Sequence, residues 1–233
     1  MLKLTITLVV LLAILIGLDR LTLLVTQKVV SDQLSTHSAL QGHTEVTFGG
    51  FPFLTQALKG KYKDIHVTGR DVTLQQLRGA SLDAHLYGVV IPVQNLIRGS
   101  VDTIPVGHTD GWVLAPYSEL ARLSGISGLT IADEGGQLAV HAPLTVAVLG
   151  KVTVDGRGTL TLSDSGVRLA VSQLSVNGVA IPAAVANAAA ATLTKTIAIP
   201  ALPYGLHITS VTATAAGLRV AGAGDDVTLT KTS

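Results

Sequence analysis

The chain has 233 residues, enough for one domain with a sizeable core or for two small domains. Apolar residues make up 48% of it and charged residues only 13%, about half of the usual charged share, so the chain must bury an unusually large apolar area or keep part of it for a ligand or a membrane. The formal net charge of +1 gives no long-range field that would attract nucleic acid, and the lack of cysteine excludes disulfides, thiolate metal sites and a cysteine nucleophile.

An apolar segment opens the chain. Fifteen residues without a charge, 4–18, follow Lys3, and this length suits a signal-peptide core or a short membrane anchor. No small-x-small cleavage site follows Leu18. We therefore expect residues 1–18 to remain as an uncleaved signal anchor rather than to be removed as a signal peptide. Residues 19–233 would then form a single domain in the cell envelope, on the exported side of the plasma membrane.

The residues after this segment are apolar on one side only. The apolar positions recur at helical spacing: Leu21, Leu24, Val25 and Val29. One helix from Thr5 to about Ser35 would be about 45 Å long at 1.5 Å per residue. We expect its first half to lie in the membrane and its second half to pack on the folded domain.

All three phenylalanines of the chain lie in one turn-rich segment, residues 48–60. Gly49-Gly50 permits unusual backbone angles, and Pro52 fixes its own φ, which predicts a strand end, a sharp turn and a short helix from Phe53 to Lys59 capped by Gly60. Lysines follow at alternate positions: Lys59, Lys61 and Lys63. Rings beside lysines suit a surface that meets an acyl chain and an anionic headgroup together. The alternative is a packed corner of the core followed by solvated lysines.

From Thr44 onward, apolar and polar residues alternate with a period of two, which is typical of strands with one buried face. Glycine-rich and Asn-Gly turns separate these strands. One set of valines shares a parity on the two sides of Gly150: Val146, Val148, Val152 and Val154. The glycine predicts a bulge or bend within one curved strand.

Two further helices interrupt the strands. The first is a short helix over residues 116–123 with proline in its first turn, and the second is alanine-rich and runs from Pro182 to about Lys195. An apolar stripe on the second helix has a spacing of four: Ile181, Val185, Ala189, Leu193 and Ile197. We expect an α+β fold, with a large curved antiparallel sheet wrapped around the long N-terminal helix and a second, alanine-rich helix, enclosing an apolar cavity.

No catalytic motif is present in the sequence. The seven histidines are scattered singly, without the i, i+4 spacing of a helical metal site, and a single histidine on a strand is usually a surface residue. The adjacent carboxylates Asp133-Glu134 and Asp225-Asp226 adjoin glycines and suit solvated turns. We therefore expect no metal, no cofactor, no nucleic-acid partner and no enzymatic activity.

Four sets of residues resemble one known family. Phe51-Pro52-Phe53-Leu54-Thr55-Gln56 with Gly60 resembles the G-F-P-F-L-T-Q…G hallmark of the LmeA-like phospholipid-binding proteins of actinobacteria, as does an apolar anchor followed by Asp19-Arg20. Residues 199–206 with Ser210-Val211 resemble the family's L-P-x-G-L…S-V element, and residues 217–220 with Asp226-Val227 resemble its last element. The resemblance implies envelope-associated phospholipid binding and a fold similar to tubular lipid-binding domains.

We therefore expect a membrane-anchored, exported protein that binds phospholipid in an apolar cavity, an anionic one such as a phosphatidylinositol type, and holds or transfers it to support envelope lipid or lipoglycan metabolism. The alternatives are a non-catalytic envelope scaffold and an enzyme of envelope glycolipids that uses acids such as Asp64 and Asp83. The residues expected to bind lipid are Phe48, Phe51, Phe53, Leu54, Leu58, Val146, Val148, Val185, Ala189 and Leu193. The residues expected to contact headgroups and the membrane are Lys59, Lys61 and Lys63.

Overall fold

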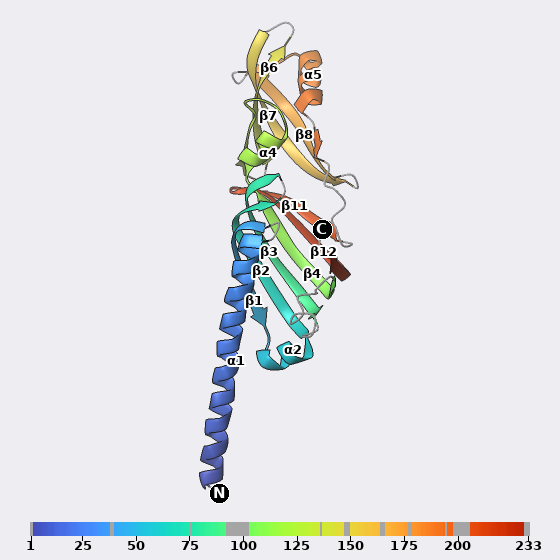
Figure 1. The fold of residues 1–233 in the computed structure, drawn as a ribbon. Helices are drawn as coiled ribbons and strands as arrows, with labels where there is room; N and C mark the ends of the chain where they lie inside the picture. Colours follow the sequence, from blue (N-terminus) through green and yellow to red (C-terminus); the bar gives the residue numbers. More distant parts are fainter. Residues whose placement is uncertain are drawn as a thin grey trace.

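The computed structural model describes residues 2–37, 40–74, 76–91, 103–135, 137–146, 150–163, 166–176, 179–193, 195–197 and 206–230 (Figure 1). The helices are α1 (Leu2–His37), α2 (Phe53–Lys59), α4 (Tyr117–Leu123) and α5 (Ala183–Leu193). The strands are β1 (Leu40–Gly49), β2 (Lys61–Leu74), β3 (Leu77–Val90), β4 (Thr103–Ala115), β5 (Thr130–Glu134), β6 (Gln137–Val146), β7 (Gly150–Ser163), β8 (Gly166–Val176), β9 (Val179–Ala180), β10 (Lys195–Ile197), β11 (His207–Thr214) and β12 (Gly217–Thr230).

The strands form two antiparallel sheets where the sequence predicted one large sheet. Sheet A has the order β1-β2-β3-β4-β12-β11, and sheet B has the order β10-β8-β7-β6-β5, with β9 paired to β8. The chain leaves sheet A after β4, builds sheet B from neighbouring strands, and returns so that β12 lies between β4 and β11. The α+β class is confirmed. Alternation reveals which residues share a face, but it does not reveal which distant strand is the partner, so it did not separate the sheets.

The second half of α1 packs on sheet A. Leu23 is buried in an apolar cluster with strands β1 to β4 and with β12, and the hydroxyl of Ser31 accepts a hydrogen bond of 2.8 Å from the backbone N–H of Val46. This contact covers part of the edge that β1 would otherwise expose. The first half of α1 projects beyond the sheet (Figure 1). Over the part of the chain that the structure describes, no helix combines the length and the apolarity needed to cross a bilayer.

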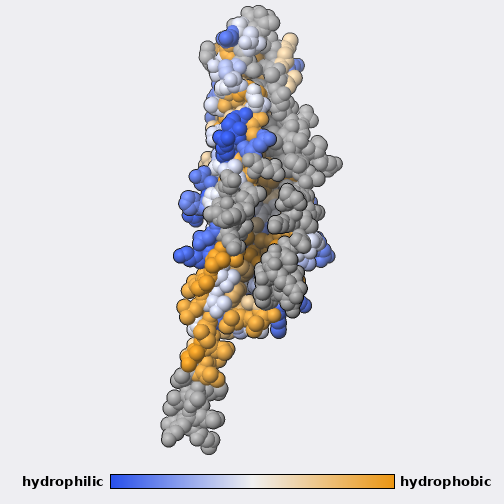
Figure 2. All heavy atoms as spheres, viewed as in Figure 1, coloured by the Kyte–Doolittle hydropathy of each residue, from blue (hydrophilic) through white to orange (hydrophobic). Residues whose placement is uncertain are grey.

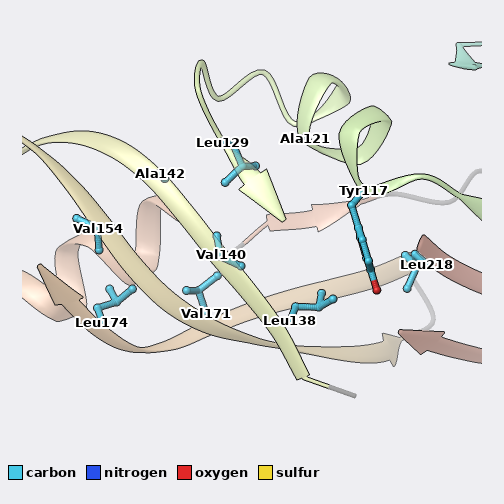
Figure 3. Packing of buried hydrophobic residues seen from close by; sticks show 10 residues of the cluster. All are labelled: Tyr117, Ala121, Leu129, Leu138, Val140, Ala142, Val154, Val171, Leu174 and Leu218. Carbon is cyan, nitrogen blue, oxygen red and sulfur yellow. The ribbon is translucent and has the colours of Figure 1, made fainter. Parts of the chain in front are cut away.

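Sheet B packs around a separate core, which we call the sheet B core (Figure 3). Tyr117 at the start of α4 reaches into it beside Leu218 of β12, and its hydroxyl donates a hydrogen bond of 2.8 Å to the backbone oxygen of Thr214. This core therefore joins the two sheets through α4. Its buried members are Tyr117, Ala121, Leu129, Leu138, Val140, Ala142, Val154, Val171, Leu174 and Leu218.

One strand prediction is wrong. β6 ends at Val146 and β7 begins at Gly150, so Val146 and Val152 lie on two antiparallel strands, with Val146 opposite Gly150. Gly150 has a φ of 73°, a left-handed conformation that glycine adopts without the penalty that a Cβ brings. Gly150 therefore begins a second, antiparallel strand and does not curve a single one.

The helices α4 and α5 begin and end close to their predicted limits. Pro116 caps α4 at its amino end, as expected from the proline. On α4, the carboxylate of Glu119 accepts a hydrogen bond from Arg122 at 2.7 Å and one from the backbone N–H of Arg78 at 3.2 Å, which ties α4 to β3. On α5, Ala186 and Ala190 pack against the sheet B core. Because their side chains are small, the helix can lie close to the sheet.

Candidate functional site

The Phe-Pro-Phe turn forms a corner at the end of sheet A. Phe53 is only 2% exposed, and its ring lies 5.5 Å from that of Phe48 and 6.3 Å from that of Tyr62. Burial raises the pKa of the Tyr62 hydroxyl. These rings belong to the cluster that also holds Leu23, which we call the foot cluster. Its buried members are Leu23, Val46, Phe53, Tyr62, Ile65, Val89, Val106 and Val227.

Two buried polar side chains hold this corner together. Asp19 of α1 is 2% exposed, and its Oδ1 accepts a hydrogen bond of 2.7 Å from the backbone N–H of Leu54, in the first turn of α2. Gln56 donates from Nε2 to the backbone oxygen of Gly49 at 3.2 Å and accepts at Oε1 from the backbone N–H of Lys63 at 2.9 Å. Asp19 thus fixes α1 to α2, and Gln56 fixes the end of β1 to the start of β2. Both residues belong to the motifs that resemble the family, but these roles were not predicted. For Asp19, the available signal was a lone acid within an apolar helical run.

The outer surface of the corner is apolar and basic. Phe51 is 50% exposed with the guanidinium of Arg20 5.2 Å from its ring centre, and Leu58 is 80% exposed. The three lysines that follow α2 are exposed as well: Lys59, Lys61 and Lys63. Figure 2 shows hydrophobic side chains gathered along the projecting part of α1 and over the end of the domain where α2 lies. Phe51 is half-exposed and Phe53 is buried, so the two rings that flank Pro52 lie in different surroundings.

A different part of sheet A carries an open, apolar pocket of about 410 Å³. Small residues on three adjacent strands share a row at its floor, since Ala84 of β3 pairs with Gly111 of β4, which pairs with Gly222 of β12. A Cβ on Gly111 would lie 2.6 Å from the backbone oxygen of Asp83, so this position accepts only glycine without a shift of the strands. The pocket is lined by Leu74, Leu77, Leu82, Ala84, Thr109, Asp110, Gly111, Trp112, Val113, Ala115, Leu206, Val220, Ala221 and Gly222.

The described part of the structure does not bring the predicted lipid-binding residues together. Phe48, Phe51, Phe53, Leu54 and Leu58 belong to the corner, and none of them lines the pocket. Val146 ends β6 in sheet B, far along the molecule from α2 (Figure 1). Val148 lies outside the described residues, as do the side chains of Val185, Ala189 and Leu193 on α5. Their role in lipid binding stays a prediction. An enclosed cavity is not seen among the described residues, and the pocket is open instead.

The two acids named for the enzyme alternative each lie beside a histidine. Asp64 Oδ1 is 3.0 Å from His85 Nδ1, and Asp83 Oδ2 is 3.2 Å from His66 Nε2. Strand alternation places Asp83 and His85 on the face of sheet A opposite to Leu82 and Ala84 of the pocket. The acids are therefore not aimed into the apolar pocket.

Comparison with known proteins gives one match. No curated protein and no solved structure matches the chain. A model of a family described as LmeA-like phospholipid-binding matches residues 17–223 of the 233, a span that includes α2, the pocket and every strand except the last part of β12. The match covers nearly all of the domain and agrees with the resemblance of the Phe-Pro-Phe motif. The chain therefore belongs to the LmeA-like phospholipid-binding family.

Proposed function

We propose that this protein binds a phospholipid with an acyl chain lying in the pocket of sheet A. The main support is the open pocket, whose floor is made of Ala84, Gly111 and Gly222 and whose walls are aliphatic. The chain also belongs to a phospholipid-binding family. Its volume of about 410 Å³ falls within the range of roughly 300–1,000 Å³ for small-molecule sites. Each methylene of the acyl chain that leaves water for such a surface contributes about 0.8 kcal/mol. Aliphatic walls can therefore bind the acyl chain without polar contacts.

The same proposal gives the corner a second role, contact with the membrane from which the lipid comes. Phe51 and Leu58 offer apolar side chains, and the three lysines after α2 attract anionic headgroups, each by about 1 kcal/mol near a charged bilayer. The exposed apolar side chains of α1 continue this surface: Leu11, Leu12, Ile14, Leu15, Leu18, Leu21 and Leu24. This charge supports a preference for anionic phospholipids, such as those with inositol headgroups.

We infer the place of action from the apolar segment near the amino terminus. The uncharged run of residues 4–18 supports export, with residues 1–18 retained as an anchor and the domain in the cell envelope. There the protein would hold or transfer phospholipid for envelope lipid or lipoglycan metabolism. Because binding and release suffice for this task, the proposal needs no reaction centre.

The full chain, expressed in a host with its envelope intact and purified in mild detergent, tests the proposal. Mass spectrometry of an organic extract should find phospholipid in a fixed ratio to protein, and anionic species should be enriched over their share of the host membrane. Lipid at the host composition, with no fixed ratio, would overturn the binding function. Conversion of an added glycolipid would favour the enzyme alternative.

A further inference from the structure

A ladder of stacked rings crosses the outer face of sheet A. His66 of β2 lies directly opposite His85 of β3, with ring centres 4.0 Å apart and planes 6° from parallel. The stack continues to Tyr87 at 5.7 Å and then to His108 of β4 at 5.9 Å. The lipid proposal uses none of these residues. A cross-strand pair places two imidazoles side by side, although they are nineteen positions apart in the sequence.

Asp83 completes a group of three possible metal ligands with these histidines. One ligand atom from each of His66, Asp83 and His85 can be chosen so that all lie within 4.8 Å of one another, and the three residues are half-buried. The Nε2 atom of His66 is itself buried and makes no hydrogen bond, although Asp83 Oδ2 is 3.2 Å away. A buried imidazole nitrogen that lies beside a carboxylate and makes no hydrogen bond is placed to coordinate a metal ion.

Asp64 prepares His85 for the same task. Its Oδ1 lies 3.0 Å from His85 Nδ1, and an ionised carboxylate can only accept, so Nδ1 carries the proton and donates it. In a neutral ring with this tautomer, the other nitrogen, Nε2, has a free lone pair. Metal-binding histidines commonly have such a carboxylate partner, which fixes the tautomer and the orientation of the ring.

We propose that His66, Asp83 and His85 bind a divalent transition-metal ion, with Asp64 as the residue that positions His85. Two imidazoles and one carboxylate suit zinc, whereas calcium and magnesium favour sites made wholly of oxygen ligands. Tetrahedral zinc holds its ligand atoms about 3.3 Å apart at bond lengths near 2.0–2.1 Å. The two imidazoles would have to turn out of their parallel stack for both lone pairs to point at one ion. Three protein ligands leave the fourth position for water or an anion.

Sheet B supplies a matched control. His141 of β6 has its Nδ1 2.6 Å from Asp155 Oδ1, so it reproduces the His85–Asp64 pair. Among the described residues, however, no second histidine and no third ligand joins it into a metal-binding group. A histidine held only by a carboxylate should therefore not contribute to zinc binding.

Zinc titration of the full-length chain, followed by calorimetry, tests the site. Wild type should bind one zinc ion per chain, the double variant His66→Ala/His85→Ala should lose at least about tenfold in affinity, and His141→Ala should be unchanged. Asp64→Asn should weaken binding by about 10–100-fold, the usual effect of losing such a partner. Wild type that binds no zinc, or a folded double variant that binds like wild type, would overturn the proposal.

A second measurement uses only the wild-type chain, so its result does not depend on whether a variant folds. Cobalt added to the wild-type chain should produce the visible absorption of a low-symmetry, nitrogen- and oxygen-ligated ion, and an equivalent of zinc should abolish it. A spectrum that stays that of cobalt in water would also overturn the proposal. Neither readout involves lipid, so its failure would leave the lipid-binding function untouched.

Discussion

Replacing Ala84 by leucine tests whether the pocket of sheet A holds a lipid chain. Ala84 lies on the pocket floor, and leucine would place three more carbons in space that the structure leaves open. If each carbon displaces one methylene of a bound chain, the loss is about 2.4 kcal/mol at about 0.8 kcal/mol per methylene. Such a loss corresponds to about a fiftyfold weaker affinity, at 1.4 kcal/mol per factor of ten.

The same substitution should lower lipid affinity but raise the free energy of unfolding of the lipid-free protein. Added carbons that fill open space bury apolar surface without strain, whereas overpacking a filled core costs roughly 1–3 kcal/mol. Affinity is measured by titrating fluorescent phospholipid, and stability by urea unfolding of delipidated protein. Ala132→Leu, at an exposed position on β5, makes the same chemical change away from the pocket. Unaltered lipid affinity in a folded Ala84→Leu protein would refute the assignment of the pocket.

Four further experiments test the corner and α4. Phe53→Ala should cost roughly 3–5 kcal/mol in urea unfolding because the ring is buried, while Phe51→Ala should cost less than about 0.5 kcal/mol, and equal costs would contradict their placement. Asp19→Ala leaves the α2 amide unpaired and should cost roughly 1–3 kcal/mol, whereas Asp19→Asn, which keeps an acceptor, should cost less. Neutralising the three lysines after α2 should slow lipid pickup from anionic vesicles and not from neutral ones, and high salt should remove the difference; slowing on both vesicle types would argue against headgroup attraction. Hydrogen bonding from Arg122 lowers the pKa of Glu119, so its stabilisation is present above the ordinary value of 4.5 and is lost as the pH falls through the lowered pKa. Glu119→Gln should flatten thermal stability against pH in that acidic range, and an unchanged profile would contradict this.

Local features of the fold could be predicted from the sequence. Gly60 ends α2 with a φ of 63°, as its place after a short helical run indicated, and Pro116 begins α4 in the same predictable way. Each of these features depends on residues within one or two turns of chain, which a sequence displays directly.

The features that depend on distant pairing could not be predicted. The pocket floor exists because Ala84, Gly111 and Gly222 fall into one row, and this row depends on the register of β3 with β4 and of β4 with β12. The third of these residues is more than a hundred positions from the second. For the same reason, the cross-strand pair of His66 and His85 could not be recognised from the i, i+4 spacing of a helical metal site. Side-chain alternation specifies a face, and only packing of the whole chain specifies the neighbouring strand.

Among the described residues, the corner and the pocket do not form one continuous lipid channel. Between them lies the foot cluster, where Val89, Val106 and Val227 are nearly inaccessible to solvent, so a chain that entered at Phe51 would have to displace a packed core. In the proposed function, the lysines would contact the membrane and would not form the mouth of the pocket. Loss of the three lysines should slow lipid pickup without changing the affinity for dispersed lipid, and Ala84→Leu should lower that affinity without changing vesicle attachment. If the lysine variant also weakened binding of dispersed lipid, headgroup and acyl chain would share one site, and the foot cluster would have to open when lipid binds.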